Sequence, residues 1–269
     1  MSGVDGHPML VDIHPTSGAP GRCLVWRLAV PMRAISSSII GGGIGPVSWV
    51  INMTVDADYA RLDPNVHLDE VAVGLGLVGR GVGLMTAVNV ASWTTAICED
   101  AVATATVGVR RPVWAADSNR RLVQPTTPGT INLVTFVPER LSDAALVNAV
   151  ATITEAKVQA LLDHRIDGTG TASDAVCILC PTSGNPDPFG GPRSVWGGRL
   201  AQAAYEAIST GIAKQRARES DPASGLPWRR RVRDRPGPRH RSGDDDRLVG
   251  EHEPIRSRCR RSDRRDPRP

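Results

Sequence analysis

The clearest hydrophobic pattern in the chain predicts a helix that begins at Ser142. Ser142 is a favourable N-cap because its hydroxyl can accept a hydrogen bond from an unpaired backbone N–H, and Asp143 suits the positive end of the helix dipole. Apolar residues then recur three or four positions apart and form one stripe, made up of Leu146, Val147, Val150, Ile153, Val158, Leu161 and Leu162. The stripe predicts a helix that packs one face against a core.

Other apolar runs have the length and spacing of strands. They cover residues 23–30, 34–40, 47–55, 82–88, 101–109 and 174–180, and Pro31 separates the first two. Helical spacing marks residues 67–75, and an alanine-rich stretch predicts a final helix over residues 196–213. Strands interspersed with a few helices predict the α+β class, as one layered sheet-and-helix domain over residues 22–214.

The two ends of the chain lack these patterns. Residues 1–21 are rich in Gly, Pro, His and Asp and predict a loose leader. Residues 215–269 hold 17 Arg against 10 Asp plus Glu, a net charge of +7; the whole chain carries +4, so residues 1–214 carry −3. An Arg/Pro/Asp-rich tail buries too little apolar surface to order itself, and we expect it to be disordered. The abrupt change of composition would also fit out-of-frame translation of a GC-rich gene.

Composition narrows the class of protein further. The chain has 269 residues, of which 41% are hydrophobic and only 4% aromatic, so its core must be built from aliphatic side chains. No run of 18 apolar residues is present and the N-terminus has no basic region followed by an apolar one, so we expect neither a membrane span nor a secretory signal. The five cysteines are widely spread and form no disulfide framework, which favours the cytoplasm.

Three motifs with familiar spacing do not carry their usual chemistry. The glycine cluster at Gly41–Gly45 is not a dinucleotide fingerprint, because Pro46 occupies the position of the third glycine. Neither of the two lysines in the chain follows a glycine, as a phosphate-binding loop requires. Cys177 and Cys180 lie three positions apart on a predicted strand and point to opposite faces, so we interpret them as small core residues.

Polar chemistry gathers at two hydroxyl-rich turns that flank the long helix. The first turn is Pro128–Asn132 and the second is Gly168–Asp174. Glycine in such turns lets backbone N–H groups approach a substrate closely. The helix between them carries Glu155 and Lys157, which lie two residues and about 200° apart around the helix axis. At most one of these two side chains is therefore expected to face a site shared with the turns.

Short motifs follow one another in a fixed order from Arg22 to Ala213. They are Ser36–Ser38 with Gly41–Gly43, Asn52, Val82–Ala87, Ala105–Val109, Gly129–Asn132, Leu141–Leu146, Glu155–Lys157, and Thr169–Thr171 with Ser173–Asp174. As a set they resemble the adenosylcobinamide amidohydrolase family of corrinoid salvage enzymes. The resemblance implies hydrolysis of the amide between the aminopropanol arm and the corrin ring of adenosylcobinamide, giving adenosylcobyric acid and 1-amino-2-propanol for cobalamin salvage. The leader and the Arg-rich tail have no counterpart in it.

Amide hydrolysis needs a nucleophile, a general base, donors for the oxyanion and a proton for the departing amine. The candidate catalytic residues under this resemblance are Glu155, Lys157, Thr171 and Asp174. Either acid would be the base and Lys157 would donate a proton or bind substrate. The nucleophile would be water, Thr171 or Ser173. The candidate substrate-binding residues, some of them as oxyanion donors, are Gly42, Gly43, Asn52, Thr86, Gly129, Thr130, Asn132, Thr169 and Gly170.

The same resemblance implies a small-molecule corrinoid as the partner, no resident cofactor and no metal ligands, although a metal requirement stays open. Thr130, Thr169 and Thr171 could instead satisfy hydrogen bonds within the turns. Two other classes of protein also remain open, and the first is a corrinoid-binding protein without catalysis. Nucleic acid is expected only through the tail, and the acids interspersed among its arginines argue against that role.

Overall fold

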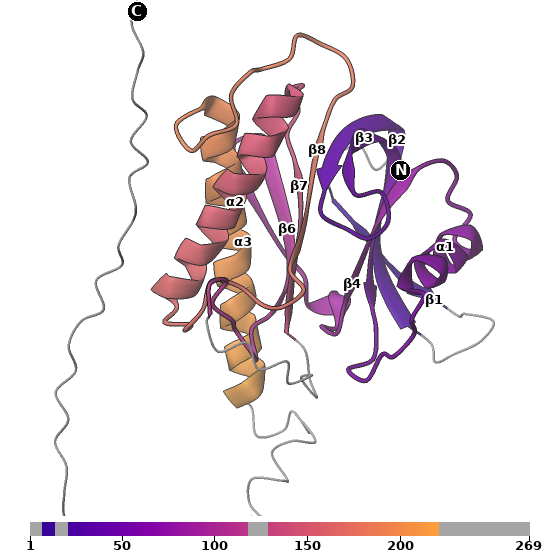
Figure 1. Ribbon diagram of the computed structural model, residues 1–269, viewed down its shortest axis with the longest axis vertical. Helices are drawn as coiled ribbons and strands as arrows, with labels where there is room; N and C mark the ends of the chain where they lie inside the picture. The colour runs from indigo at the N-terminus through magenta and orange to yellow at the C-terminus, as the bar shows by residue number, and fades with distance from the viewer. Residues whose placement is uncertain (1–6, 14–20, 118–128, 221–269) are drawn as a thin grey trace, which may run out of the picture. The chain divides into compact units, whose positions relative to one another are not determined.

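The computed structural model describes residues 7–13, 21–117 and 129–220, which form one sheet and three helices (Figure 1). The strands are β1 (Met9–Ile13), β2 (Gly21–Ser36), β3 (Gly43–Thr54), β4 (Gly81–Thr86), β5 (Thr94–Cys98), β6 (Ala101–Gly108), β7 (Thr130–Phe136) and β8 (Ala175–Cys180). The helices are α1 (Pro64–Gly74), α2 (Asp143–Asp163) and α3 (Val195–Ser220), with a short 3-10 turn at Val90–Ser92. This mixture confirms the predicted α+β class.

The order of the strands explains why the two hydroxyl-rich turns meet. The sheet has eight strands in the order β4-β3-β2-β8-β7-β6-β5, and β1 pairs with β2 beside this path. β7 and β8 are neighbouring parallel strands, and α2 is the crossover between them. Parallel strands begin at the same end of a sheet, and here Asn132 pairs with Ala175. The turn before β7 and the turn before β8 therefore lie next to each other.

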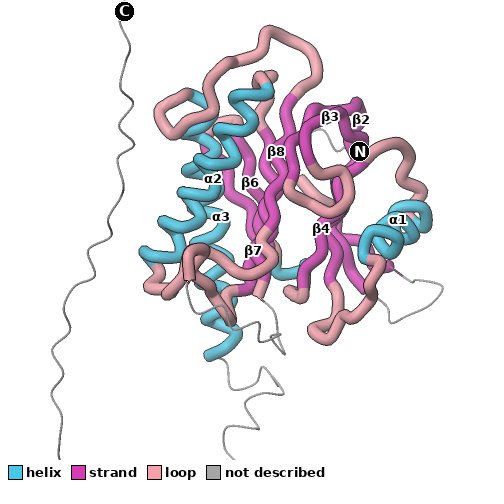
Figure 2. The backbone as a smooth tube through the Cα atoms, in the orientation of Figure 1, coloured by secondary structure: helices cyan, strands magenta, loops and turns pink. Residues whose placement is uncertain are grey.

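Helices cover the sheet in two separate places. α2 and α3 pack side by side over β6 and β7 (Figure 1), in a core that includes Leu133, Ile153 and Ile208, each exposed by 1% or less. α1 covers the other half of the sheet, where Leu68 packs with Ile51 and other residues of β2 and β3. Figure 2 shows the strands running between these two groups of helices.

The second face of β7 and β8 packs against strands instead of helices. Val134 and Cys177 point away from α2 and join a core with Leu24, Val50 and Leu84, which come from β2, β3 and β4. Residues of β2, β3 and β4, at one end of the sheet, therefore pack against residues of β7 and β8 in the middle of the sheet. This arrangement requires a strongly curved sheet, and the bend in the long β2–β3 hairpin supplies it.

The bend in β2 is where the structure differs from the predicted strands. The sequence predicts two strands separated by Pro31, whereas β2 runs unbroken from Gly21 to Ser36. Its pairing with β3 shifts register between Arg27 and Met32. Pro31 lies inside this irregularity, where a residue without an N–H removes no ladder hydrogen bond. The proline therefore bends the strand instead of ending it.

The ends of the domain also differ from expectation. Met9–Ile13 forms β1 on the edge of β2, so these residues are not part of a loose leader. β5 was not predicted, because its five residues form too short a run to stand out. α3 continues to Ser220, past the expected boundary at Lys214. The predicted disorder of the tail falls largely on residues 221–269, which lie outside the described part of the chain.

The long helix forms as its sequence predicts. The Ser142 hydroxyl accepts a hydrogen bond from the Ala145 N–H, and Asp143 lies in the first turn. In the described ranges, α2 is the one helix long and apolar enough to cross a membrane. Eight of its residues are buried in the domain, including Leu146 and Leu161. Val147 and Leu162 of the predicted stripe are exposed, by 58% and 49%, so the buried face of the helix is narrower than the stripe.

The cysteines of β8 are core residues, as the sequence indicates. Cys177 and Cys180 are fully buried and belong to the cores on opposite faces of the sheet. Burial raises the pKa of the Cys177 thiol to about 12, and burial does the same for Cys23. Cys98 is only partly buried, and all four of these cysteines are free thiols.

We expect Cys98 alone among these four to react rapidly with a thiol reagent at pH 8. A thiol with a pKa of about 12 is almost entirely protonated at that pH and is also shielded from the reagent. The measurement is a count of labelled thiols in a Cys259→Ser variant, native and unfolded. One rapid thiol in the native protein and four after unfolding are expected, and rapid labelling of two or more in the native protein would contradict the burial.

Candidate active site

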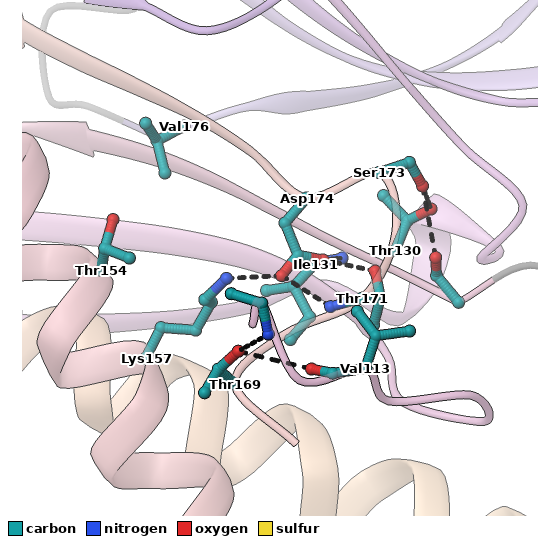
Figure 3. A network of polar contacts seen from close by, with 12 residues as sticks. Val113, Thr130, Ile131, Thr154, Lys157, Thr169, Thr171, Ser173, Asp174 and Val176 are labelled. Carbon is teal, nitrogen blue, oxygen red and sulfur yellow. Dashed lines mark hydrogen bonds and ion pairs between the residues drawn. The ribbon is translucent and has the colours of Figure 1, made fainter. Parts of the chain in front are cut away.

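Asp174, the last residue before β8, collects hydrogen bonds from both hydroxyl-rich turns (Figure 3). Its Oδ1 accepts from the Ile131 N–H at 2.8 Å and from the Thr171 hydroxyl at 2.5 Å. Its Oδ2 accepts from the Thr171 N–H at 3.0 Å. These bonds join the second turn to the start of β7, which is the neighbour that the parallel pairing dictates.

Lys157 supplies a fourth donor from α2. Its ammonium nitrogen lies 2.5 Å from Asp174 Oδ2, and the two side chains are only 13% and 12% exposed. Their attraction is therefore screened by water far less than that of an exposed pair. With four donors the acceptor positions of the carboxylate are filled. The network fixes the helix, the second turn and β7 relative to one another.

The structure brings three of the four predicted catalytic residues together. Lys157, Thr171 and Asp174 share the network just described. Glu155 is exposed on α2, and the described contacts give it no hydrogen bond or ion pair. The expected separation of about 200° around the helix explains why Lys157 faces the turns and Glu155 does not.

A second hydroxyl pair lies at the rim of this network. Ser173 Oγ donates to the backbone oxygen of Gly129 at 3.3 Å and lies 2.8 Å from Thr130 Oγ1 (Figure 3). When both bonds form, Thr130 is the donor between the two hydroxyls. Ser173 is exposed, whereas Thr130 is only 3% exposed. A substrate at this rim would therefore meet Ser173 first.

Thr169 and Gly170 shape the second turn. The Thr169 hydroxyl accepts from the Ala115 N–H at 2.9 Å, so it joins the turn to a segment of the chain that lies far away in sequence. A Cβ on Gly170 would lie 2.5 Å from Asp174 Oδ2 and 2.7 Å from Lys157 Nζ, closer than carbon atoms approach such groups. Glycine is thus needed for the ion pair to form. The Thr171 N–H is committed to Asp174 in this arrangement.

Three other predicted substrate-binding residues lie beneath the network. Asn132 Nδ2 donates to Asn52 Oδ1 and to the backbone oxygen of Met85, both at 2.9 Å, and Asn52 Nδ2 donates to Thr106 Oγ1 at 3.0 Å. Thr86 Oγ1 accepts from the Val88 N–H at 3.1 Å. Asn52, Thr86 and Asn132 are exposed by 2% or less. Asn52 and Asn132 join facing strands, whereas Thr86 makes a local bond at the end of β4, and in this arrangement none of the three exposes a surface to a substrate.

Gly42 lies in the exposed loop between β2 and β3, and Gly43 is the exposed first residue of β3. The Arg80 guanidinium donates to the backbone oxygen of Gly42 at 3.2 Å, and Gly43 has a positive φ of 81°. The other end of the loop reaches β8, where the Ser37 N–H donates to the Val176 oxygen and the Ser37 hydroxyl accepts from the Val176 N–H, both at 3.1 Å. The loop therefore begins beside β8, the strand that directly follows Asp174.

Sequence reasoning did not select several residues that shape this site. Ser37 belongs to the motif Ser36–Ser38, and the glycine cluster that starts at Gly41 shortly after it was the available clue. Ile131 contributes only its backbone N–H, and Val113 meets Gly170 through a backbone bridge, so neither side chain carries a recognisable pattern. Within the described residues, no group of three or more His, Cys, Asp or Glu side chains could hold a metal ion.

Comparison with known proteins identifies the class to which this domain belongs. Residues 11–220 match the family model described as adenosylcobinamide amidohydrolase. A protein of that name from Methanosarcina mazei is 30% identical over 189 residues, 67% of this chain and 90% of the relative. A namesake from Halobacterium salinarum is 28% identical over 203 residues, 73% of this chain and 87% of the relative.

The chain is therefore a hydrolase that acts on an amide. It belongs to the adenosylcobinamide amidohydrolase family. The matched residues run from β1 to the end of α3 and include every residue of the Asp174 network. A solved structure, the PH0078 protein from Pyrococcus horikoshii, is also similar, at 10% identity and a TM-score of 0.42 over 77% of this chain and 84% of that one.

Proposed function

We propose that this chain hydrolyses the amide joining the aminopropanol arm to the corrin ring of adenosylcobinamide. The products are adenosylcobyric acid, which can re-enter cobamide assembly, and 1-amino-2-propanol. Family membership supports the substrate class. The observation that carries the assignment of the site is the hydrogen bond between the Thr171 hydroxyl and Asp174. The carboxylate of Asp174 is also paired with the ammonium of Lys157.

In the proposed reaction Thr171 Oγ1 attacks the amide carbon while Asp174 accepts its proton. The C–N bond then breaks, the proton passes to the nitrogen of the departing amine, and a threonyl ester remains. Water adds to this ester, with Asp174 again accepting the proton, and releases the carboxylic acid and the Thr171 hydroxyl. A nucleophile and a base within hydrogen-bond reach, with the base oriented by further groups, is the arrangement that this chemistry requires.

Lys157 and the turn have supporting roles in this scheme. The ammonium of Lys157 holds Asp174 in place and keeps positive charge near the oxyanion that forms. Gly129 and Gly170 let the groups of the site pack closely, because a Cβ would lie 2.6 Å from the Gly108 oxygen at the first position and 2.5 Å from Asp174 Oδ2 at the second. Ser173 and Thr130 lie at the rim, where their hydroxyls suit the polar arm of the substrate.

We further propose that the reaction needs no resident metal or cofactor. Every acceptor position of Asp174 already has a donor, and one of these donors is a cation. A metal ion would have to displace Lys157 to reach it. We also propose a cytoplasmic location, in line with the free thiols among the described residues.

The test is detection of both products by mass spectrometry after purified full-length protein is incubated with adenosylcobinamide. We expect stoichiometric adenosylcobyric acid and aminopropanol, in equal yield with and without a chelator. Retention of corrinoid without release of aminopropanol would instead identify a binding protein without catalysis. Loss of activity with the chelator, restored by a divalent metal, would overturn the metal-free scheme.

A further inference from the structure

A short segment outside the predicted motifs is fastened to the turn that carries the candidate nucleophile. The Val113 N–H donates to the Gly170 oxygen at 2.8 Å, the Thr169 N–H donates to the Val113 oxygen at 2.9 Å, and the Ala115 N–H donates to the Thr169 hydroxyl at 2.9 Å. A Cβ on Gly168 would lie 2.8 Å from the Pro112 ring. The segment at residues 112–117 thus lies directly against the second turn.

This segment presents two adjacent apolar side chains to solvent. Val113 is 40% exposed and Trp114 is 46% exposed. The Trp114 indole is nevertheless held, because its Nε1–H donates to Asp167 Oδ1 at 3.1 Å. A large ring that is half exposed and fixed by its polar end is typical of a contact surface, since it offers apolar area with little further loss of side-chain freedom.

Gly170 contacts both the segment that carries Trp114 and the ion pair of Lys157 and Asp174. The Gly170 oxygen accepts from the Val113 N–H, and the space above its Cα is bounded by Asp174 and Lys157. One glycine therefore separates the fixed indole segment from the candidate catalytic groups. Because Lys157 and Asp174 are only 13% and 12% exposed, a large substrate can bring no more than its scissile arm to them. The rest of such a substrate must lie on the surface around the turn.

We propose that Trp114 is a substrate-positioning residue whose indole packs against the corrin ring while the amide arm reaches Thr171 and Asp174. The proposal rests on the proposed function, because it takes the substrate from there. A corrin ring is a large macrocycle that carries methyl groups between its amide arms, and the fixed indole offers an apolar surface for that part of the substrate. Binding energy gained at such a remote contact holds the whole substrate on the protein, in the ground state and the transition state alike.

The test compares kinetic constants of full-length variants with adenosylcobinamide. We expect Trp114→Ala to raise KM at least fivefold with kcat within about twofold, and Trp114→Phe to recover most of the loss. Asp167→Ala should raise KM partially because it frees the indole, whereas Asp167→Asn keeps an acceptor and should not. Phe189→Ala is the matched control, since Phe189 is 68% exposed on another loop, and should behave as wild type.

Equilibrium dialysis separates this inference from the proposed reaction. In an Asp174→Asn background, Trp114→Ala should weaken binding of adenosylcobinamide at least fivefold, and equally for cobinamide without the adenosyl group. If wild-type protein binds the corrinoid but releases no product, the proposed function fails while the dialysis still tests Trp114. Unchanged KM and binding in Trp114→Ala overturn the proposal, as does absence of corrinoid binding by wild type. If Trp114→Ala weakens binding of adenosylcobinamide but not of cobinamide without the adenosyl group, the proposed contact between Trp114 and the corrin ring is wrong.

Discussion

Asp174→Asn should lower the turnover of adenosylcobinamide roughly a hundredfold or more, about 2.7 kcal/mol of barrier. The neutral amide cannot accept the proton from the attacking hydroxyl. Its NH2 group would also face the N–H of Ile131 or of Thr171, which in the wild type donate to the carboxylate of Asp174. Thr171→Ala should cost about as much, whereas Thr171→Ser keeps the hydroxyl and should stay within about tenfold of wild type. The measurement is kcat from initial rates of aminopropanol release.

Glu155→Gln is the matched control for this prediction. It also neutralises a carboxylate on the helix that supplies Lys157, but Glu155 is exposed and outside the network, so we expect kcat within about twofold of wild type. Asp174→Asn strands the buried ammonium of Lys157 and should lower stability, so melting curves must accompany the rates. A Lys157→Met, Asp174→Asn double variant removes the stranded charge. Near-wild-type turnover in Asp174→Asn and Thr171→Ala would dispose of the proposed base and nucleophile.

The fold could be predicted from the sequence wherever its determinants are local. The cap at Ser142 and the apolar stripe that follows it act within one or two helical turns, so α2 begins where predicted. Pro31 misled, because whether a proline ends a strand or bends it depends on the partner strand. Predicting β1 also requires knowledge of the partner strand, because Met9–Ile13 forms a strand by pairing with the edge of β2.

The site shows the same division between local and long-range information. Spacing on a helix predicted that Glu155 and Lys157 could not both face the turns, and the structure shows that Lys157 does. The choice between them depends on how α2 is rotated against the sheet, which the sequence does not specify directly. The burial of Asn52 and Asn132 likewise follows from the curvature of the sheet, which brings β3 against β7. Their polar character alone gave no means of distinguishing a structural role from a binding one.

Gly170→Ala should reduce kcat roughly thirtyfold or more while the protein stays folded. The added methyl group would lie 2.5 Å from Asp174 Oδ2 and 2.7 Å from Lys157 Nζ, so both groups must shift away from it. Both of these groups are at the ends of side chains, which can shift, and we expect a loss of stability of only about 1–3 kcal/mol. A misplacement on the order of 1 Å at a catalytic group is enough to cost about a hundredfold in rate.

Gly74→Ala provides the control for the added methyl group itself. Nothing lies within 4 Å of a Cβ at Gly74, its φ is not positive, and it ends α1 on the other half of the sheet. We expect unchanged kcat and stability within about 1 kcal/mol of wild type. Measured together, kcat and melting temperature separate two explanations for Gly170. A large loss of kcat with a small loss of stability means that the glycine is there to let Lys157 and Asp174 meet. Comparable stability loss without a change in kcat would mean that the pair only holds the turn to the helix.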